Sequence, residues 1–554
     1  MSSSKPWLDN YPSGIPANID PSKYNSILEY LDETCKKFKN KSAFSLMGKE
    51  ITYKQLDKMS TQFGAYLQSR GLKPGDKFAI MLPNVLQYPV AIFGALKAGL
   101  VVVNTNPLYT PREMEHQFND SEAKGILILE NFASKLEQII DKTSVEVVLT
   151  TGIGDMLGGV KGSLVNFAIK NVKRMIPKYN LVNTIQFKDA VKQGSKFQIN
   201  ENFQNGPDDV IVLQYTGGTT GVSKGAMLTN RNLVANMMQI KTFITPYLNE
   251  EGDQIILAPL PMYHIFAFTV NCLAAMDLGA LTVLVVNPKE LKTVVKEFGR
   301  YKITGMTGVN TLYNALLNNE DFKKADYSHL EFVAAGGTAL QKNVAIKWEE
   351  LTGKIISEGY GMTEASPVVT SNPKGATKLG TVGVPVPSTE LRIVDEDDNV
   401  LGFNEVGEIQ TRGPQVMKGY YNKPDETAKT ITADGWLRTG DIGQISEEGY
   451  LSIVDRKKDM IIVSGFNVYP NEIEDVLALH PKVLEAAAIG VPCDKSGERV
   501  KVFVVKKDNS LNSDELIQHC RENLTGYKVP KEVEFRKELP KTNVGKILRR
   551  ALKE

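Results

Sequence analysis

Short apolar runs alternate with amphipathic stretches along the first part of the chain, and this alternation restricts the fold more than any other feature. The stretch at 52–71 places Leu56, Met59, Phe63 and Leu67 at helical spacing. The neighbouring runs are continuous, as in strands that are buried on both faces of a parallel sheet: KFAIML, GLVVVN, GILILE at 125–130 and VEVVLTT at 145–151. The pattern predicts an α/β architecture with largely parallel sheets.

The composition and the hydrophobic pattern of the sequence change near residue 380 and again near residue 455. Residues 380–454 are rich in Gly, Pro and short alternating strands, which predicts a small β-barrel or sandwich-like unit. Residues 455–554 mix helical and strand patterns over a length typical of one compact domain. We therefore expect a large N-terminal domain over 1–454, built from two α/β sheet subdomains and the β-rich part. A small, mobile α+β domain over 455–554 should follow it.

Charge and cysteine content argue against several classes of protein. The 65 Lys and Arg residues balance 64 Asp and Glu residues, so no overall field favours nucleic acid. The 4 cysteines are scattered and lack metal-ligand or disulfide spacing, which is typical of a reducing compartment. The opening residues lack the apolar core of a signal peptide, and no charge-free run of about 18 apolar residues occurs. These features predict a cytoplasmic protein that is not an integral membrane protein.

Residues 215–225 read YTGGTTGVSKG, a loop suited to binding an anion. The Walker spacing is absent, because Lys224 does not follow a glycine directly. Lys224 nevertheless supplies a cation, and the other residues let backbone N–H groups approach closely or add hydroxyl donors: Thr216, Gly217, Gly218, Thr219, Thr220, Gly221 and Ser223. The composition predicts a polyphosphate loop of another kind.

The same loop has a second interpretation. GVSKG at 221–225 matches G-x-S-x-G, the pattern that displays a nucleophilic serine on a strand-to-helix turn. A serine hydrolase would then use Ser223, with His329, His480 or His519 as the base, and would need no ATP.

Four further segments decide between these interpretations: YGMTEAS at 360–366, DGWLRTGDIG at 434–443, DRKKDMIIVSGFNVYPNEIE at 455–474 and LPKTNVGKILRR at 539–550. Together with the loop they resemble the adenylate-forming superfamily and, within it, the bacterial long-chain fatty acid:CoA ligases. The resemblance runs from about residue 106 to the C-terminus. It implies that a fatty acid and MgATP give acyl-AMP and pyrophosphate, and that CoA then displaces AMP to give the thioester.

The resemblance assigns the ATP site motif by motif. The loop at 216–224 would hold the β- and γ-phosphates, and Glu364, with Thr363 and Thr220, would bind Mg²⁺. Asp441 would accept the ribose hydroxyls, assisted by Arg456. Tyr360 would stack on the adenine, and the remaining contacts to the base come from two short segments: Gly336, Gly337, Thr338, Gly361 and Met362. Without the resemblance, the alternative for Glu364 is a helix N-cap carboxylate, and Asp441 is more typical of a turn.

The resemblance also assigns the catalytic lysine and the acyl site. Lys546, which composition alone would place on the solvated surface, would bridge the acyl carboxylate and the α-phosphate. The small domain would then rotate about Lys458, so that Gly465 and Phe466 line a channel for the CoA thiol. Acyl binding falls to His264, Gly308, Val309 and Gly336. Without the resemblance, His264 is typical of a core histidine.

One segment stands apart from these motifs. Residues 158–178 contain five basic and no acidic residues. The spacing predicts a helix whose apolar face carries Val165, Ala168, Ile169, Val172, Met175 and Ile176. Such a helix either docks on the inner face of the cytoplasmic membrane or packs on its own domain.

Three further alternatives remain open on the sequence. A medium-chain, short-chain, aryl or amino-acid-activating ligase shares these motifs. A non-catalytic lipid-binding protein shares the fold but is expected to lose Lys546 or Glu364, and both are present. Either a monomer or a homodimer is compatible with the sequence.

Overall fold

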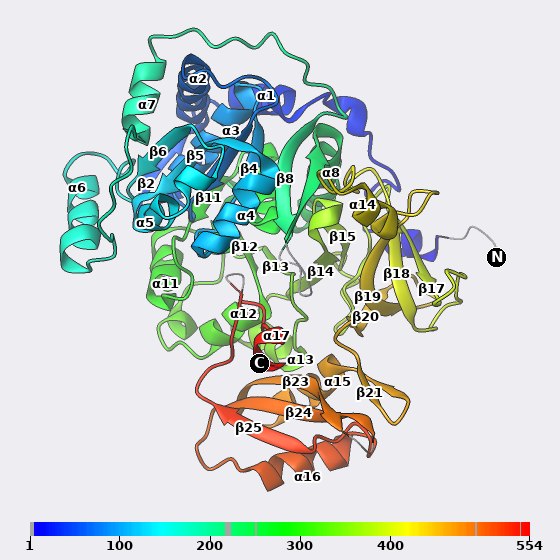
Figure 1. Ribbon diagram of the computed structural model, residues 1–554. Coiled ribbons are helices and arrows are strands. Elements are labelled where there is room, and N and C mark those ends of the chain that lie inside the picture. Colours follow the sequence, from blue (N-terminus) through cyan, green and yellow to red (C-terminus); the bar gives the residue numbers. More distant parts are fainter. Residues whose placement is uncertain (1–4, 217–222, 250–251, 494–495, 543–544, 554) are drawn as a thin grey trace.

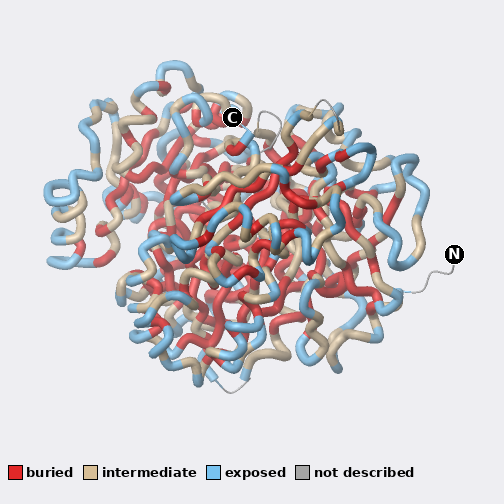
Figure 2. The backbone as a smooth tube through the Cα atoms, turned by 90° about the horizontal axis from the view of Figure 1, so that it is seen from below, coloured by how far each residue is buried: buried red, intermediate tan, exposed pale blue. Residues whose placement is uncertain are grey.

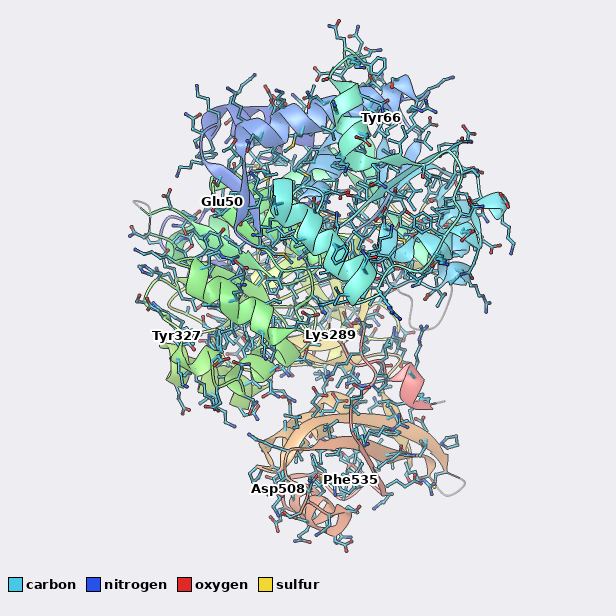
Figure 3. All side chains as sticks on the ribbon, turned by 90° about the vertical axis from the view of Figure 1, so that its left-hand side faces the viewer. Glu50, Tyr66, Lys289, Tyr327, Asp508 and Phe535 are labelled. Atoms are coloured by element: carbon cyan, nitrogen blue, oxygen red, sulfur yellow. The ribbon has the colours of Figure 1, made fainter. Side chains whose placement is uncertain are left out.

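The computed structural model describes residues 5–216, 223–249, 252–493, 496–542 and 545–553. They form a large unit that contains three sheets, and a small C-terminal unit that contains a fourth (Figure 1). Figure 3 shows Asp508 and Phe535 on the small unit, set apart from Glu50, Tyr66 and Tyr327 on the large one. Buried backbone is concentrated in the interior, and exposed backbone forms the rim (Figure 2).

The first sheet has seven strands, and all its neighbours are parallel except the last pair, β8 and β9. In spatial order the strands are β7 (Ile185–Gln186), β6 (Val147–Thr151), β5 (Ala123–Leu129), β3 (Lys77–Met81), β4 (Val101–Asn104), β8 (Val210–Thr216) and β9 (Lys224–Thr229). The continuous apolar runs are buried strands here, which confirms the prediction of parallel α/β sheets.

The second sheet has nine strands, with a parallel centre and antiparallel edges. Its order is β16 (Val384–Pro385), β15 (Val368–Ser371), β14 (Ser357–Gly361), β13 (Phe332–Ala335), β12 (Gly305–Gly308), β10 (Ile255–Ala258), β11 (Leu281–Leu284), β1 (Ser42–Leu46) and β2 (Lys49–Thr52). One extensive apolar core joins residues of both large sheets and of the helices between them.

Helices cover the two large sheets. The helix predicted over 52–71 is α2 (Tyr53–Ser69); a capping box between Thr52 and Gln55 fixes its start, and its apolar stripe is buried. The other main helices of the large unit are α1 (Ile27–Lys37), α3 (Gln87–Lys97), α4 (Pro111–Ser121), α5 (Ala133–Glu137), α6 (Gly159–Phe167), α7 (Phe187–Gly194), α8 (Asn230–Ile244), α9 (Ile265–Ala267), α10 (Ala275–Asp277), α11 (Leu291–Arg300), α12 (Asn310–Leu317), α13 (Lys342–Thr352) and α14 (Pro424–Thr430).

The β-rich part is an open sheet rather than the predicted barrel. Its four antiparallel strands are β17 (Glu390–Val394), β18 (Gly407–Arg412), β19 (Leu437–Ile445) and β20 (Leu451–Arg456), in that order. Within the described residues, β17 and β20 remain edges of this sheet. Closure is not needed, because the apolar side chains of the sheet pack on Ala365, Val369 and Val382 of the large unit.

The small unit is the α+β body that the C-terminal sequence predicts. Its sheet contains β21 (Ile461–Val463), β22 (Phe466–Val468), β23 (Val483–Cys493), β24 (Gly497–Lys506) and β25 (Glu532–Arg536). Its helices are α15 (Pro470–Leu479), α16 (Ser513–Asn523) and α17 (Arg550–Lys553), and α15 and α16 pack on the sheet. The domain boundary predicted after residue 454 falls within β20, which continues to Arg456. The exact position of the boundary stays a prediction.

The basic segment at 158–178 differs from its prediction. Regular helix ends at Phe167 and continues as a π-helical turn over Ala168–Val172. Gly162 sets the docking face, because a Cβ there would lie 2.3 Å from the Gly154 carbonyl oxygen. Asn166 completes this contact by accepting a hydrogen bond from the Gly154 N–H and donating one to Asp155.

The apolar side chains of this segment are divided between a packed side and an exposed side. Val165 of the predicted apolar face packs against the core of the large unit. Five apolar side chains are exposed, and two of them, Val172 and Met175, also belong to the predicted face: Val160, Leu164, Phe167, Val172 and Met175. Within the described residues, no helix is long and apolar enough to cross a bilayer.

Candidate active site

The flanks of the predicted phosphate loop lie at the tip of the β8–β9 hairpin. Thr216 ends β8 and lies opposite Lys224, which begins β9. The loop residues Gly217, Gly218, Thr219, Thr220 and Gly221 lie outside the described residues. Lys224 Nζ lies 2.7 Å from Glu426 Oε2 and 4.7 Å from the centroid of the Tyr420 ring. A hydrogen-bonded carboxylate and an aromatic face therefore hold this cation at the loop.

Glu364 lies close to Lys224, joined to it through Tyr420. It sits on a short turn, Thr363–Ala365, that directly follows the end of β14, and its side chain is buried. The Tyr420 hydroxyl donates to Glu364 Oε1 at 2.7 Å. Burial raises the pKa of Glu364, while the bond from Tyr420 and the charge of Lys224 oppose this. The arrangement places a carboxylate beside a cation at the phosphate loop.

Asp441, Tyr360 and Arg456 form one group joined by a hydrogen bond and an ion pair. The Tyr360 hydroxyl donates to Asp441 Oδ2 at 2.6 Å, and Arg456 Nε lies 3.4 Å from Asp441 Oδ1. Asp441 and Arg456 face each other across β19 and β20. Gly361 follows Tyr360, and a Cβ there would lie 2.1 Å from the Pro367 carbonyl oxygen, so only glycine fits. The predicted ribose and adenine residues are thus brought together.

The GGT segment follows β13 on the same side of the second sheet. Gly336 is buried against the Phe266 ring, and Gly337 has a φ of +79° that suits glycine. The Thr338 Oγ1 atom is buried and has no hydrogen-bond partner among the described residues. A buried hydroxyl of this kind fits a ligand that supplies the missing partner.

Lys546 reaches the same region from the small unit. The Thr311 hydroxyl donates to the Gly545 carbonyl at 3.3 Å, which fixes the backbone beside Lys546. Burial lowers the pKa of Lys546 to about 7, helped by the charge of Arg456 and opposed by Asp441. Lys546 is also the charged neighbour that lowers the pKa of His264. Lys546 therefore lies among the predicted nucleotide and acyl residues.

The predicted acyl residues surround this lysine. His264 caps α9, and its Nδ1 accepts the Phe266 N–H at 3.3 Å. Burial lowers the pKa of His264 to about 4, so the imidazole is neutral at physiological pH. Val309 is buried, and its Cγ2 would lie 3.2 Å from a Cβ on Gly545. Gly308 precedes it, packed against the Tyr313 ring.

The predicted CoA-channel residues lie elsewhere. The predicted hinge residue Lys458 lies near the site, because partial burial lowers its pKa and the charges of Asp441 and Glu364 oppose this. Gly465 and Phe466 are exposed at β22, where the Phe466 ring stacks on Tyr527 with centroids 4.7 Å apart. Lys458 is exposed in the link between β20 and β21. This link joins the last strand of the large unit to the first strand of the small unit. The roles of Gly465, Phe466 and Lys458 stay predictions.

The hydrolase interpretation finds no support in the described contacts. His480 and His519 belong to the small unit, where their rings contact each other at 5.1 Å between centroids. His519 Nε2 donates to the Val476 carbonyl. Among the described residues the bond to Ser223 comes from His116, whose Nε2 donates to the Ser223 backbone carbonyl and not to its hydroxyl.

Three residues of the site carried no signal in the sequence. Tyr420 binds Glu364, and Glu426 binds Lys224. Arg549 binds several carboxylates near Lys546. Tyr420 is positioned by long-range pairing, since residues 418–421 hydrogen-bond to β9. Arg549 occurs within LPKTNVGKILRR, but the sequence does not reveal its partners.

Two α/β sheets, a small C-terminal unit and the lysine that it delivers define an adenylate-forming architecture. A family model described as AMP-binding enzyme matches residues 31–421, and the model of the AMP-binding enzyme C-terminal domain matches residues 472–546. The chain belongs to the AMP-binding enzyme family.

Relatives that cover the whole chain are similar to it. A long-chain-fatty-acid–CoA ligase of Yersinia pestis is 53% identical and one of Salmonella typhimurium is 52% identical; each match covers 99% of this chain and 98% of the relative. The solved structure of the anthranilate CoA ligase AuaEII in complex with anthranoyl-AMP has a TM-score of 0.85 at 25% identity. That match covers 96% of this chain and 98% of the other.

Proposed function

We propose that this protein is an AMP-forming long-chain fatty acid:CoA ligase. The observation that carries the proposal is the position of Lys546, which the small unit delivers to the Asp441–Arg456 pair and to His264. Two relatives that are more than half identical over the full chain are named for this activity, whereas the aromatic-acid ligase is 25% identical.

The site residues divide the first step among them. Lys546, when protonated, stabilises the charge that develops as the carboxylate oxygen attacks the α-phosphorus. Asp441 and Arg456 orient the ribose, and Tyr360 and the GGT segment hold the adenine. Lys224 neutralises the outer phosphates, for which it must exchange Glu426 for the substrate. His264, neutral at physiological pH, positions the acyl carboxylate without adding a second cation.

The residues present fit a magnesium ion that is bound mainly through substrate. Glu364 offers a carboxylate beside Lys224, and the Thr363 hydroxyl is adjacent to it in the chain. Mg²⁺ binds through one or two carboxylates together with substrate phosphates, and Glu364 supplies one such carboxylate. When bound, the ion would neutralise charge on the leaving pyrophosphate.

The second step needs a different arrangement of the small unit. Gly465 and Phe466 lie exposed at the start of β22, while Lys546 occupies the site. Rotation about Lys458 would withdraw the lysine and bring β22 to the acyl-AMP, where the CoA thiol displaces AMP. No side chain has to act as a covalent nucleophile, because the adenylate is already activated.

Steady-state assays of AMP release and acyl-CoA formation with acids of graded chain length test this proposal. Each methylene that a substrate buries contributes about 0.8 kcal/mol, so kcat/KM should rise several-fold per methylene until the acyl site is filled. We expect ATP-dependent AMP release and oleoyl-CoA formation from oleate, with octanoate and benzoate as much poorer substrates. A preference for benzoate, or ester hydrolysis without ATP, would contradict the proposal.

We further propose that α6 and the segment that follows it dock on an anionic membrane, where long-chain fatty acids partition. The exposed apolar patch consists of Val160, Leu164 and Phe167 on α6, which projects from the large unit (Figure 1), and of Val172 and Met175 in the segment that follows it. Basic side chains are interleaved with it: Lys161, Lys170, Lys173, Arg174 and Lys178. Apolar and basic groups on one projecting segment suit the boundary between acyl chains and anionic headgroups.

A further inference from the structure

A cluster of buried charge lies close to the active site but outside it, centred on Arg549. Arg549 Nη1 lies 3.4 Å from Asp455 Oδ1 and 3.3 Å from Asp459 Oδ2. Its Nη2 donates to Asn471 Oδ1 at 2.6 Å and to Glu474 Oε2 at 2.9 Å. The Arg549 side chain is 16% exposed and that of Asp455 is 0% exposed. A single guanidinium therefore binds three acidic side chains away from water.

The cluster crosses the junction between the large and small units. Asp455 belongs to β20, where it lies opposite Ile442 in the four-stranded sheet. Asn471 and Glu474 belong to α15 of the small unit. The Asn471 N–H donates to Asp455 Oδ2 at 2.8 Å, and its side chain donates to the Val454 carbonyl. Asp455 is thus the residue of the large unit to which Asn471 and Arg549 of the small unit bind. The predicted hinge residue Lys458 follows it three residues later in the chain.

The same two chain segments carry the catalytic pair and the cluster. On β20, Asp455 is followed by Arg456, which pairs with the ribose ligand Asp441. On the C-terminal segment, Lys546 is followed three residues later by Arg549, just before α17 begins. Ile547 between them packs on the core of the small unit, so this segment cannot shift freely. Binding Arg549 to Asp455 therefore sets the distance of Lys546 from Asp441 and Arg456.

The charges of the cluster make it specific to this arrangement of the units. Burial raises the pKa of Glu474 to about 7 and also raises that of Asp455, while Arg549 opposes both shifts. Its bonds to Glu474 lie within the small unit and survive a rotation. Its contact with Asp455 joins the two units across the link, and rotation about that link would change it.

We propose that Arg549 is a positioning residue for the adenylation step. By binding Glu474 and Asp455 together, it holds Lys546 in place while acyl-AMP forms, and its contact with Asp455 breaks when the small unit rotates for the CoA step. This inference rests on the proposed ligase function and adds a residue that acts through Lys546. It predicts that weakening the contact slows the first half-reaction alone.

Two variants of the full chain test the role. Arg549→Lys keeps the charge but loses the planar fork, and Asp455→Asn leaves every contact of Arg549 within the small unit in place. Acyl-AMP formation is measured from oleate and ATP without CoA, and oleoyl-CoA formation from preformed oleoyl-AMP and CoA. Arg550→Lys, at the adjacent exposed position, is the matched control.

The expected result is a split between the half-reactions. Misplacing a catalytic group by about 1 Å costs about a hundredfold in rate, so both variants should lose roughly this much of the adenylation rate. Their thioester formation should stay within about twofold of the parent, and Arg550→Lys should match the parent in both assays.

Three outcomes are distinguishable. Unchanged adenylation in Asp455→Asn, or an equal loss of both half-reactions in that variant, overturns the positioning role. If Arg549→Lys unfolds, as thermal unfolding would reveal, Asp455→Asn alone decides. A parent protein that forms no oleoyl-AMP refutes the proposed ligase function and not the role of Arg549.

Discussion

At the scale of single residues, the charge state of Lys546 is the most informative quantity. Its pKa is lowered from 10.5 to about 7, first by burial and then by the charge of Arg456. The lysine is therefore protonated below about pH 7 in the free enzyme and loses its proton as the pH rises through that value. Only the protonated form can stabilise the negative charge of the adenylation transition state.

This predicts opposite pH dependences for the two half-reactions. The kcat/KM for ATP in acyl-AMP formation should fall as the pH rises above about 7, because it reports ionisations of the free enzyme. Thioester formation from preformed oleoyl-AMP should instead rise with pH, since the CoA thiolate is the nucleophile. Stopped-time assays across this range measure both. An adenylation kcat/KM that climbs with pH would show that the neutral lysine, or another group, is at work.

How far single residues could be predicted depends on whether their role is local. Glu364 and Asp441 sit in short motifs whose chemistry is readable; the structure places Asp441 beside Arg456, as expected, and Glu364 near Lys224, while Thr220 lies outside the described residues. Tyr420 and Arg549 act through partners that lie far away in the chain, and no local pattern encodes such a partner. The low pKa of His264 likewise follows from burial that only the fold creates.

At the scale of elements, the segment at α6 shows why a helical pattern is insufficient. The sequence predicted one apolar face, but Gly162 and Asn166 determine which side of the helix docks. A glycine that permits close backbone approach outweighs apolar side chains in setting this contact. The side chains left exposed are those that we propose to enter the membrane.

Charge reversal of this segment tests the membrane proposal. Each basic residue near an anionic surface contributes about 1 kcal/mol, so reversing Lys170, Lys173 and Arg174 should weaken binding to phosphatidylglycerol vesicles by at least about a hundredfold. Lys37, Lys39 and Lys54 are exposed on another part of the large unit, and their reversal is the matched control. Sedimentation with vesicles measures both triple variants. Equal binding by the two would leave α6 as a packed surface helix.

At the scale of the whole molecule, the architecture was predictable and its long-range order was not. Continuous apolar runs gave parallel sheets, because strands that are buried on both faces have no polar side. The nine-stranded sheet, however, pairs β1 with β11, from distant parts of the chain. The β-rich part was expected to close on itself, whereas the large unit covers its apolar face. Alternating patterns do not reveal what will cover a sheet.

The whole-molecule account assigns one lysine to one of two half-reactions. The small unit delivers Lys546 to the large one, and a rotation would remove it before CoA reacts. Lys546→Ala should therefore lose on the order of 3 kcal/mol of transition-state stabilisation in adenylation, or about a hundredfold in rate. Lys553→Ala, at an exposed position of α17, is the matched control.

The most direct test of this claim measures the rates of the two half-reactions of Lys546→Ala separately. Acyl-AMP formation from oleate and ATP should nearly disappear, while oleoyl-CoA formation from preformed oleoyl-AMP and CoA should continue at close to the parent rate. If a folded Lys546→Ala protein loses both half-reactions equally, Lys546 is not specific to adenylation, and rotation of the small unit between two working positions is the wrong mechanism for this protein.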